Sequence, residues 1–151
     1  MADPRSTPAP RQPVVLLIDD EPLLLEVIAR ELRESFDLHT AGSAAEADKQ
    51  VAARAFDAVI CDHMLPGEQG LDFLIRLKEK APSTRRILMT GYTNIEFISR
   101  STAIGGLSAC LVKPVRASEI ASAVRAALGL PRTAGRPPEP APQKRGGGAS
   151  P

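Results

Sequence analysis

Residues 14–22 read VVLLIDDEP, and much of the fold can be inferred from this stretch. Its first five residues are apolar on both faces of an extended chain, which is typical of a parallel strand covered by helices on both sides. Proline at position 22 suits the first turn of a helix. The stretch therefore predicts a strand, a short acidic turn and a helix in direct succession.

Apolar runs and amphipathic stretches alternate in the same way along the chain. We expect further strands at 58–61, 87–89 and 107–112, and a weaker edge strand at 38–41. Five such units with short connections predict an α/β fold, namely a doubly wound, flavodoxin-like (βα)5 structure whose five-stranded parallel sheet has the order 2-1-3-4-5. The apolar residues at helical spacing are Leu24, Val27, Ile28 and Leu32; Ala44, Ala47, Val51 and Ala55; Leu71, Leu74 and Ile75; Ile95, Ile98 and Thr102; and Ile120, Val124 and Leu128.

The composition of the 151 residues excludes several classes of protein. Lys and Arg total 19 against 18 Asp and Glu, so the net charge gives no reason to expect direct binding to nucleic acid or to an anionic membrane. Cys61 and Cys110 are too few for a disulfide framework, and no Cys/His spacing fits zinc. No apolar run approaches the ~18 residues of a membrane helix. We therefore expect a cytoplasmic protein.

Proline is concentrated at the two ends of the chain. Ten of the 14 prolines lie in residues 1–13 and 131–151, which contain no Leu, Ile, Phe or Tyr. Such segments cannot bury a core, so we expect two disordered tails around one domain at residues 14–130. The segment after Leu130 is too short and too rich in Pro and Gly for an output domain, which predicts a single-domain protein.

Polar residues follow the carboxyl ends of four predicted strands: Asp19 and Asp20, then Asp62, Thr90 and Lys113. Neighbouring strands lie ~4.8 Å apart, and the switch point of the predicted order falls between the first and third strands. We therefore expect these side chains to meet in one crevice at that edge of the sheet.

Each of these residues also has an ordinary structural explanation when it is taken alone. Asp19 and Asp20 could stabilise the following helix through its dipole, and Asp62 could begin a turn. Thr90 could cap the next helix, and Lys113 could be a solvated charge. The coincidence of all five at one edge favours a shared function.

Three carboxylates at one edge require a cation, because two carboxylates ~4 Å apart repel by about 4 kcal/mol at an effective dielectric near 20. Mg²⁺ binds through one or two carboxylates together with waters and phosphate oxygens, and a carboxylate can itself accept a phosphoryl group. We therefore predict that Asp62 is the phosphoacceptor, that Asp19 and Asp20 bind Mg²⁺, and that Thr90 and Lys113 contact the phosphoryl oxygens.

Four motifs resemble the CheY-like receiver domain of bacterial two-component response regulators. They are LIDDE at 17–21, DHMLPG at 62–67 with Gly70 and Leu71 beyond it, MTG at 89–91, and LVKP at 111–114. Together they extend over nearly the whole predicted domain, in the order and at the separations that the family has.

This resemblance implies that Asp62 takes a phosphoryl group from a phosphohistidine on a sensor histidine kinase or a phosphotransfer protein. It also implies that Mg²⁺ is bound by Asp20 and Asp62, through water by Asp19, and by the backbone carbonyl of Met64. A cis peptide bond before Pro114 is implied as well, and it would direct the preceding lysine into the crevice.

This sequence departs from the family pattern at position 110. The family usually has a Tyr or Phe there, and its ring moves inward together with the hydroxyl at the position of Thr90. Cys110 has no ring, so we expect it to be a small packed side chain at this switch position. Met64 and Tyr92 occupy positions that, in the family, lie beside the path of the attacking water. Neither offers a strong base, which predicts slow hydrolysis of the acyl phosphate. We expect His63 to be an exposed loop residue with no role as a base.

These features predict a single-domain response regulator whose output is phosphorylation-dependent docking to an unidentified protein. Phosphorylation is expected to pull Thr90 and to shift the surface of the fourth helix, fifth strand and fifth helix. The protein would catalyse its own phosphorylation and dephosphorylation without turning over an external substrate. The alternative is a phosphorylation-independent adaptor with the same fold, which Cys110 favours and the intact set of polar side chains opposes.

Overall fold

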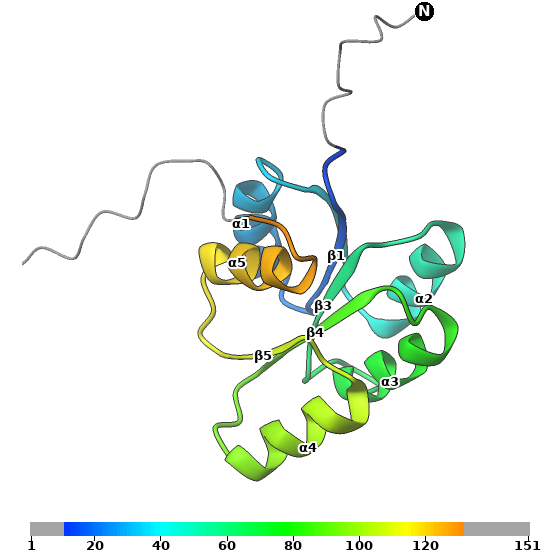
Figure 1. The fold of residues 1–151 in the computed structure, drawn as a ribbon, viewed down its shortest axis with the longest axis vertical. Coiled ribbons are helices and arrows are strands. Elements are labelled where there is room, and N and C mark those ends of the chain that lie inside the picture. The colour runs from blue at the N-terminus through cyan, green and yellow to red at the C-terminus, as the bar shows by residue number, and fades with distance from the viewer. Residues whose placement is uncertain (1–10, 132–151) are drawn as a thin grey trace, which may run out of the picture.

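The computed structural model describes residues 11–131, which form a parallel sheet with helices on both faces (Figure 1). The strand order is β2-β1-β3-β4-β5, so the predicted doubly wound fold with the order 2-1-3-4-5 is confirmed. The elements are β1 (Val14–Ile18), α1 (Pro22–Leu32), β2 (Asp37–Ala41), α2 (Ala44–Ala53), β3 (Ala58–Asp62), α3 (Gly70–Lys80), β4 (Arg85–Thr90), α4 (Ile95–Gly105), β5 (Ala109–Val112) and α5 (Ala117–Ala127).

The predicted tails, residues 1–13 and 131–151, lie outside the described residues except for 11–13 and 131. The described part of the first of them continues into β1, and the carbonyl of Pro13 accepts a hydrogen bond of 2.9 Å from the backbone N–H of Asp37. Among the described residues, no helix has the length and apolar character that a membrane span requires.

The sheet register places the ends of the central strands level with one another. Ile18 of β1 pairs with Cys61 of β3, and Asp62 pairs with Met89 of β4. All five residues of β3 are buried, because helices cover both faces of this strand. The residues that follow β1 and end β3 are thereby held at the same edge of the sheet.

Two apolar clusters, one on each face of the sheet, form the core (Figure 1). On one face, α1 and α5 bury side chains such as Leu32, Ile120 and Val124. On the other face, α2 and α3 bury residues that include Phe73 and Leu74, and α4 packs against α3 and β5. The helices are amphipathic because each exposes its other side to solvent.

Four details of the sequence-based element assignment are wrong. Val27 is 63% exposed, because the buried face of α1 is formed by Ile28, Ala29 and Leu32 and Val27 lies beside that face. Ile95 is 78% exposed, since α4 buries its small residues Ser101 and Gly105 instead. The helix α2 ends at Ala53, before Ala55, and β5 begins at Ala109 rather than Leu107.

Candidate functional site

The carboxyl ends of β1 and β3 and the residue after β5 form a buried ion-pair cluster. Lys113 directs its Nζ at Oδ2 of Asp19 and at Oδ2 of Asp62, each at 3.0 Å. The Asp19 and Asp62 side chains are almost fully buried, and the Lys113 side chain is 26% exposed. The peptide bond between Lys113 and Pro114 is cis. The structure therefore brings together three of the residues that the sequence analysis placed in one crevice.

Asp20 completes an acidic group at this edge. Carboxylate oxygens of Asp19, Asp20 and Asp62 all lie within 4.8 Å of one another, and Asp20 is the exposed member. Three carboxylates face one lysine, which leaves an excess of negative charge that a hard divalent cation would neutralise. The oxygen donors and their spacing thus fit Mg²⁺.

Burial and charge act in opposite directions on these groups. Burial raises the pKa of the Asp62 carboxyl, the charge of Asp19 adds to this, and the hydrogen bond from Lys113 reduces the rise. For Lys113, burial alone would lower the pKa, but the hydrogen bonds and charges of Asp62 and Asp19 outweigh it and raise the pKa. The lysine is therefore held in its charged form beside the carboxylates.

The loop between β3 and α3 is folded tightly around Asp62. The backbone N–H of Met64 donates to Oδ1 of Asp62 at 3.4 Å, and Met64 also forms an antiparallel bridge with Gln69. The N–H of Gly70 donates to the carbonyl of His63 at 2.8 Å. A Cβ at Gly70 would lie 2.0 Å from the carbonyl oxygen of Asp62, so only glycine fits this approach.

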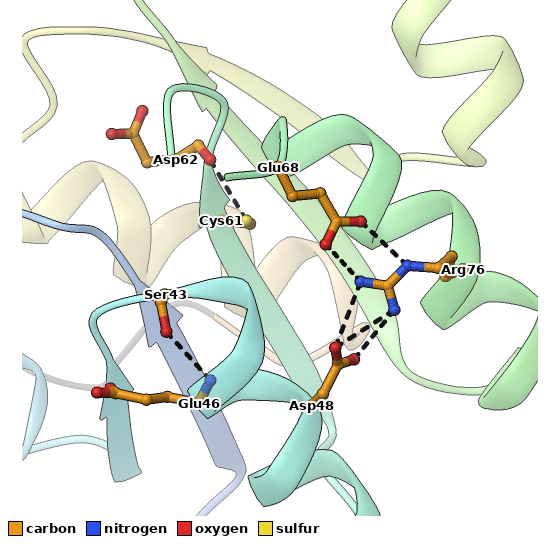
Figure 2. Close-up of polar contacts among 7 residues, drawn as sticks. All are labelled: Ser43, Glu46, Asp48, Cys61, Asp62, Glu68 and Arg76. Atoms are coloured by element: carbon orange, nitrogen blue, oxygen red, sulfur yellow. Dashed lines mark hydrogen bonds and ion pairs between the residues drawn. The ribbon is translucent and has the colours of Figure 1, made fainter. Parts of the chain in front are cut away.

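A second ion-pair network fastens the far end of the same loop. Arg76 of α3 donates from Nε and NH2 to Glu68, at 3.0 and 2.7 Å, and from NH1 to Asp48 of α2 at 3.1 Å. Figure 2 shows the carboxylate of Asp62 pointing away from this network and the thiol of Cys61 directed at the Asp62 carbonyl. The distance between this sulfur and the carbonyl oxygen is 3.4 Å. Arg76 therefore joins the loop to two helices without touching the acidic group.

Thr90 is buried at the end of β4, and its hydroxyl accepts a hydrogen bond of 3.0 Å from the backbone N–H of Tyr92. It does not cap the next helix, because Asn94 does so by accepting from Glu96 N–H at 2.8 Å. Tyr92 is half exposed, and its hydroxyl lies 4.0 Å from the sulfur of Met64. The two predicted rim residues are thus neighbours.

The expectation that His63 is exposed is wrong, because its side chain is only 3% exposed. The ring lies edge-on to Phe97 at 5.0 Å between centroids and to Tyr92 at 5.7 Å, so aromatic packing draws it inward. Burial lowers the pKa of its imidazole. Cys110, at the predicted switch position, is half-buried on the edge strand β5, and burial raises the pKa of its thiol.

The sequence analysis missed Phe97 and Arg76. Phe97 could have been noticed because the chain has only four Phe and one Tyr, and two of these five lie within six residues after Thr90 and Gly91. No sequence signal marks Arg76, since its partners lie 8 and 28 residues away and meet it only in the folded chain.

Residues 15–125 match the family model described as the response regulator receiver domain. The chain is 31% identical over 121 residues to the hydrogenase transcriptional regulatory protein HoxA of Bradyrhizobium diazoefficiens, a match that covers 80% of this chain and 25% of that protein. It is 34% identical over 119 residues to the probable transcriptional regulatory protein TcrX of Mycobacterium tuberculosis, covering 78% of this chain and 50% of that protein. The chain thus spans between a quarter and a half of the length of these relatives.

Among solved structures, the signal receiver domain of an HD domain-containing protein from Pseudomonas fluorescens has a TM-score of 0.72 and 33% identity to this chain. The match covers 79% of this chain and 96% of that one. The family match extends over most of the described residues, the strand order agrees, and the acidic group lies at the expected strand ends. The chain therefore belongs to the receiver domain family of two-component response regulators.

Proposed function

We propose that Asp62 accepts a phosphoryl group from a phosphohistidine on a sensor histidine kinase or a phosphotransfer protein. The observation that carries this proposal is the placement of Asp62, which shares Lys113 with Asp19 and lies beside Asp20 at the edge of the sheet. A carboxylate so placed can act as a nucleophile while the other two bind a cation.

In the transfer, one carboxylate oxygen of Asp62 attacks phosphorus in line with the bond to the imidazole nitrogen. The new O–P bond forms as the N–P bond breaks, and the imidazole leaves with the electron pair and takes up a proton. Lys113 and the hydroxyl of Thr90 would each contact one of the phosphoryl oxygens, whose charge they would stabilise.

Mg²⁺ would be held by Asp20 and Asp62, by Asp19 through water, and by the carbonyl of Met64. When bound, it would neutralise the carboxylates and the phosphoryl oxygens. The β3–α3 loop supports this assignment, because the hydrogen bond between Met64 and Asp62 keeps the loop beside the acidic group.

The output of the domain is phosphorylation-dependent docking to another protein, through the surface formed by α4, β5 and α5. The exposed side chains of Ile95, Ile104 and Val112 on α4 and β5 support this part of the proposal, because they offer apolar contacts to a partner. Tyr92 and Met64 at the rim offer no strong base to an attacking water, so the acyl phosphate is long-lived.

A labelled small-molecule phosphodonor supplied with Mg²⁺ tests the proposal. We expect the full chain to take up label that base removes, Asp62→Ala to take up none, and Asp72→Ala to label like the wild type, because Asp72 is an exposed aspartate outside the crevice. Absence of label from the wild type would instead support the phosphorylation-independent adaptor, which the missing ring at Cys110 favours.

A further inference from the structure

Three rings are packed together beside the acidic crevice, and we name His63, Tyr92 and Phe97 the aromatic trio. The centroid distances are 5.0 Å between His63 and Phe97, 5.7 Å between His63 and Tyr92, and 5.2 Å between Tyr92 and Phe97, and all three pairs are edge-on. Because every pair is in contact, a ring that moves toward the others must displace at least one of them.

The aromatic trio joins the candidate site to a helix. His63 follows the proposed phosphoacceptor Asp62 directly, Tyr92 lies on the loop after β4, and Phe97 lies in the first turn of α4. Side chains from three segments are thus packed as one unit that connects the crevice to the start of α4.

Thr90 acts on the same unit from the other side. Its hydroxyl accepts a hydrogen bond of 3.0 Å from the N–H of Tyr92. When Thr90 Oγ1 is drawn toward a phosphoryl oxygen in the proposed reaction, it either carries the backbone of Tyr92 with it or leaves this hydrogen bond. Displacements at Asp62 and at Thr90 therefore both reach Phe97 through the aromatic trio.

A buried nitrogen in the aromatic trio favours a second arrangement. Nδ1 of His63 is buried, and within the described part of the chain it has no hydrogen-bond partner. A buried polar atom left unpaired costs about 1–3 kcal/mol. The unpaired Nδ1 destabilises the observed arrangement, which brings a second arrangement that gives Nδ1 a partner closer to it in free energy, so the packed unit is suited to two states.

Cys110 is unable to fill this role. It lies on the edge strand β5, is half-buried, and packs with the apolar cluster that includes Phe73 and Leu88. Its thiol has neither a ring nor the length to transmit a displacement of Thr90 to α4.

We propose, on the basis of the phosphoryl transfer proposed above, that His63 is a positioning residue that couples Asp62 to the first turn of α4 through Phe97. The aromatic trio then transmits the displacement of Thr90 that, in the family, the ring at position 110 transmits. This assigns the internal relay of the signal to residues on the β3–α3 loop, the β4–α4 loop and the first turn of α4 instead of β5.

The test uses the full chain with Mg²⁺ and beryllofluoride, a mimic of the phosphoryl group. Fluorine NMR reports binding of the mimic, and amide NMR shifts of Ile95–Gly105 report the response of α4. We expect the wild type to bind the mimic and to shift the amides of α4. If the wild type binds no mimic, both the proposed phosphoryl transfer and the coupling are overturned.

His63→Leu is the decisive variant. It should bind the mimic at least as tightly as the wild type, because binding no longer has to rearrange the aromatic trio, and the α4 shifts should be lost. A purely structural role for His63 predicts the opposite, namely weaker binding of the mimic. If His63→Leu binds the mimic and keeps the α4 response, the coupling is overturned while the phosphoryl transfer stands.

Four further variants complete the test. His63→Phe restores the ring contact and should retain the α4 shifts. Phe97→Leu should lose the α4 shifts, and it replaces His63→Leu as the test variant if His63→Leu fails to fold. The double variant His63→Leu/Phe97→Leu should lose no more than either single change, because both act on one contact. Cys110→Ala is the matched control, and loss of the α4 response in this variant would also overturn the coupling.

Discussion

Asp62 is the residue at which burial and charge conflict most directly. Its carboxyl lies almost fully buried beside Asp19, with one lysine shared between the two, and burial raises its pKa. A carboxyl whose pKa is higher in the folded protein than in the unfolded chain stabilises the fold below its unfolded pKa, and this contribution is lost as the pH rises through the folded pKa. Ionised Asp62 is thus a source of instability that the bound cation would remove.

We expect Asp62→Asn to melt a few degrees above the wild type at neutral pH in metal-free buffer, because the amide cannot ionise. The difference should shrink as the pH falls and vanish below about 4, where the wild-type carboxyl is protonated in both states. Thermal unfolding followed by circular dichroism across this range checks the prediction. The exposed control Asp72→Asn should show no such pH-dependent gain, and a gain of equal size there would contradict the explanation.

The positions of single residues were predicted well where they depend on the order of the strands along the chain. Asp19, Asp62 and Lys113 could be placed from the ends of apolar runs, because parallel strands end at one edge of the sheet. His63 was misjudged, because its burial depends on Phe97, which is distant in sequence and reaches it only when α4 packs.

The junction of β3 and α3 depends on one close backbone approach. Gly70 begins α3 directly against the carbonyl of Asp62. A methyl group there would push the helix away from the strand and displace the loop that carries Met64. The position of the loop and the packing of the helix are therefore linked.

Gly70→Ala should lower the free energy of unfolding by about 1–3 kcal/mol, the usual cost of overpacking. It should also weaken Mg²⁺ binding, because the displaced loop carries Met64. Gly91→Ala is the matched control, since a Cβ there would meet nothing within 4 Å, and we expect a change within about 0.5 kcal/mol. Urea unfolding and a Mg²⁺ titration measure both effects. Equal stability of the two variants would show that the approach at Gly70 is not restrictive.

Arg86 ties the end of α4 to β4. Its buried guanidinium donates to four backbone carbonyls, those of Gly105 at 3.0 Å, Gly106 at 3.1 Å, Thr84 at 2.8 Å and Pro82 at 3.5 Å. The carbonyls at the end of a helix carry partial negative charge, so those of Gly105 and Gly106 help to compensate the cation. This contact holds α4 at the end opposite the aromatic trio.

Arg86→Lys should lower the free energy of unfolding by about 2–3 kcal/mol, because one ammonium cannot reach all four carbonyls and leaves buried acceptors unpaired. Its exposed neighbour provides the control, and Arg85→Lys should change the stability by less than about 0.5 kcal/mol. Chemical denaturation of both variants makes the comparison. A near-neutral Arg86→Lys would mean that water satisfies these carbonyls.

Across the molecule, the sheet separates two apolar clusters that must fold together. Leu74 of α3 is fully buried in one cluster and Ile120 of α5 in the other. The central strands contribute alternate side chains to both clusters, for example Ile60 to one and Val59 to the other. Loss of packing on either face of the sheet should therefore destabilise the entire domain.

We expect Leu74→Ala and Ile120→Ala each to lower the free energy of unfolding by about 2–5 kcal/mol, because each leaves a cavity. The effects should add to within about 0.5 kcal/mol in the double variant, since the two side chains share no contact. Each variant should unfold in a single transition when unfolding is followed by circular dichroism. Two separate transitions would show that the faces fold independently.

The fold and most of the acidic crevice could be inferred without coordinates. Apolar runs define the strands, the alternation with helices requires a parallel sheet, and strand ends then place Asp19, Asp62 and Lys113 together, because all of this depends on local periodicity and general rules of chain connection. The exposure of Val27 and Ile95 did not follow, since helical spacing gives a face but not the neighbour that covers it.

The aromatic trio and the Arg76 network became visible only in the folded chain. Their members are joined by contacts between His63 and Phe97, and between Arg76 and Asp48, which lie far apart in sequence. Such contacts depend on the distance and angle at which two helices settle on the sheet, and these follow from the packing of many side chains at once. The placement of Asp62 can be inferred from local order, whereas the proposed route from it to α4 depends on that packing.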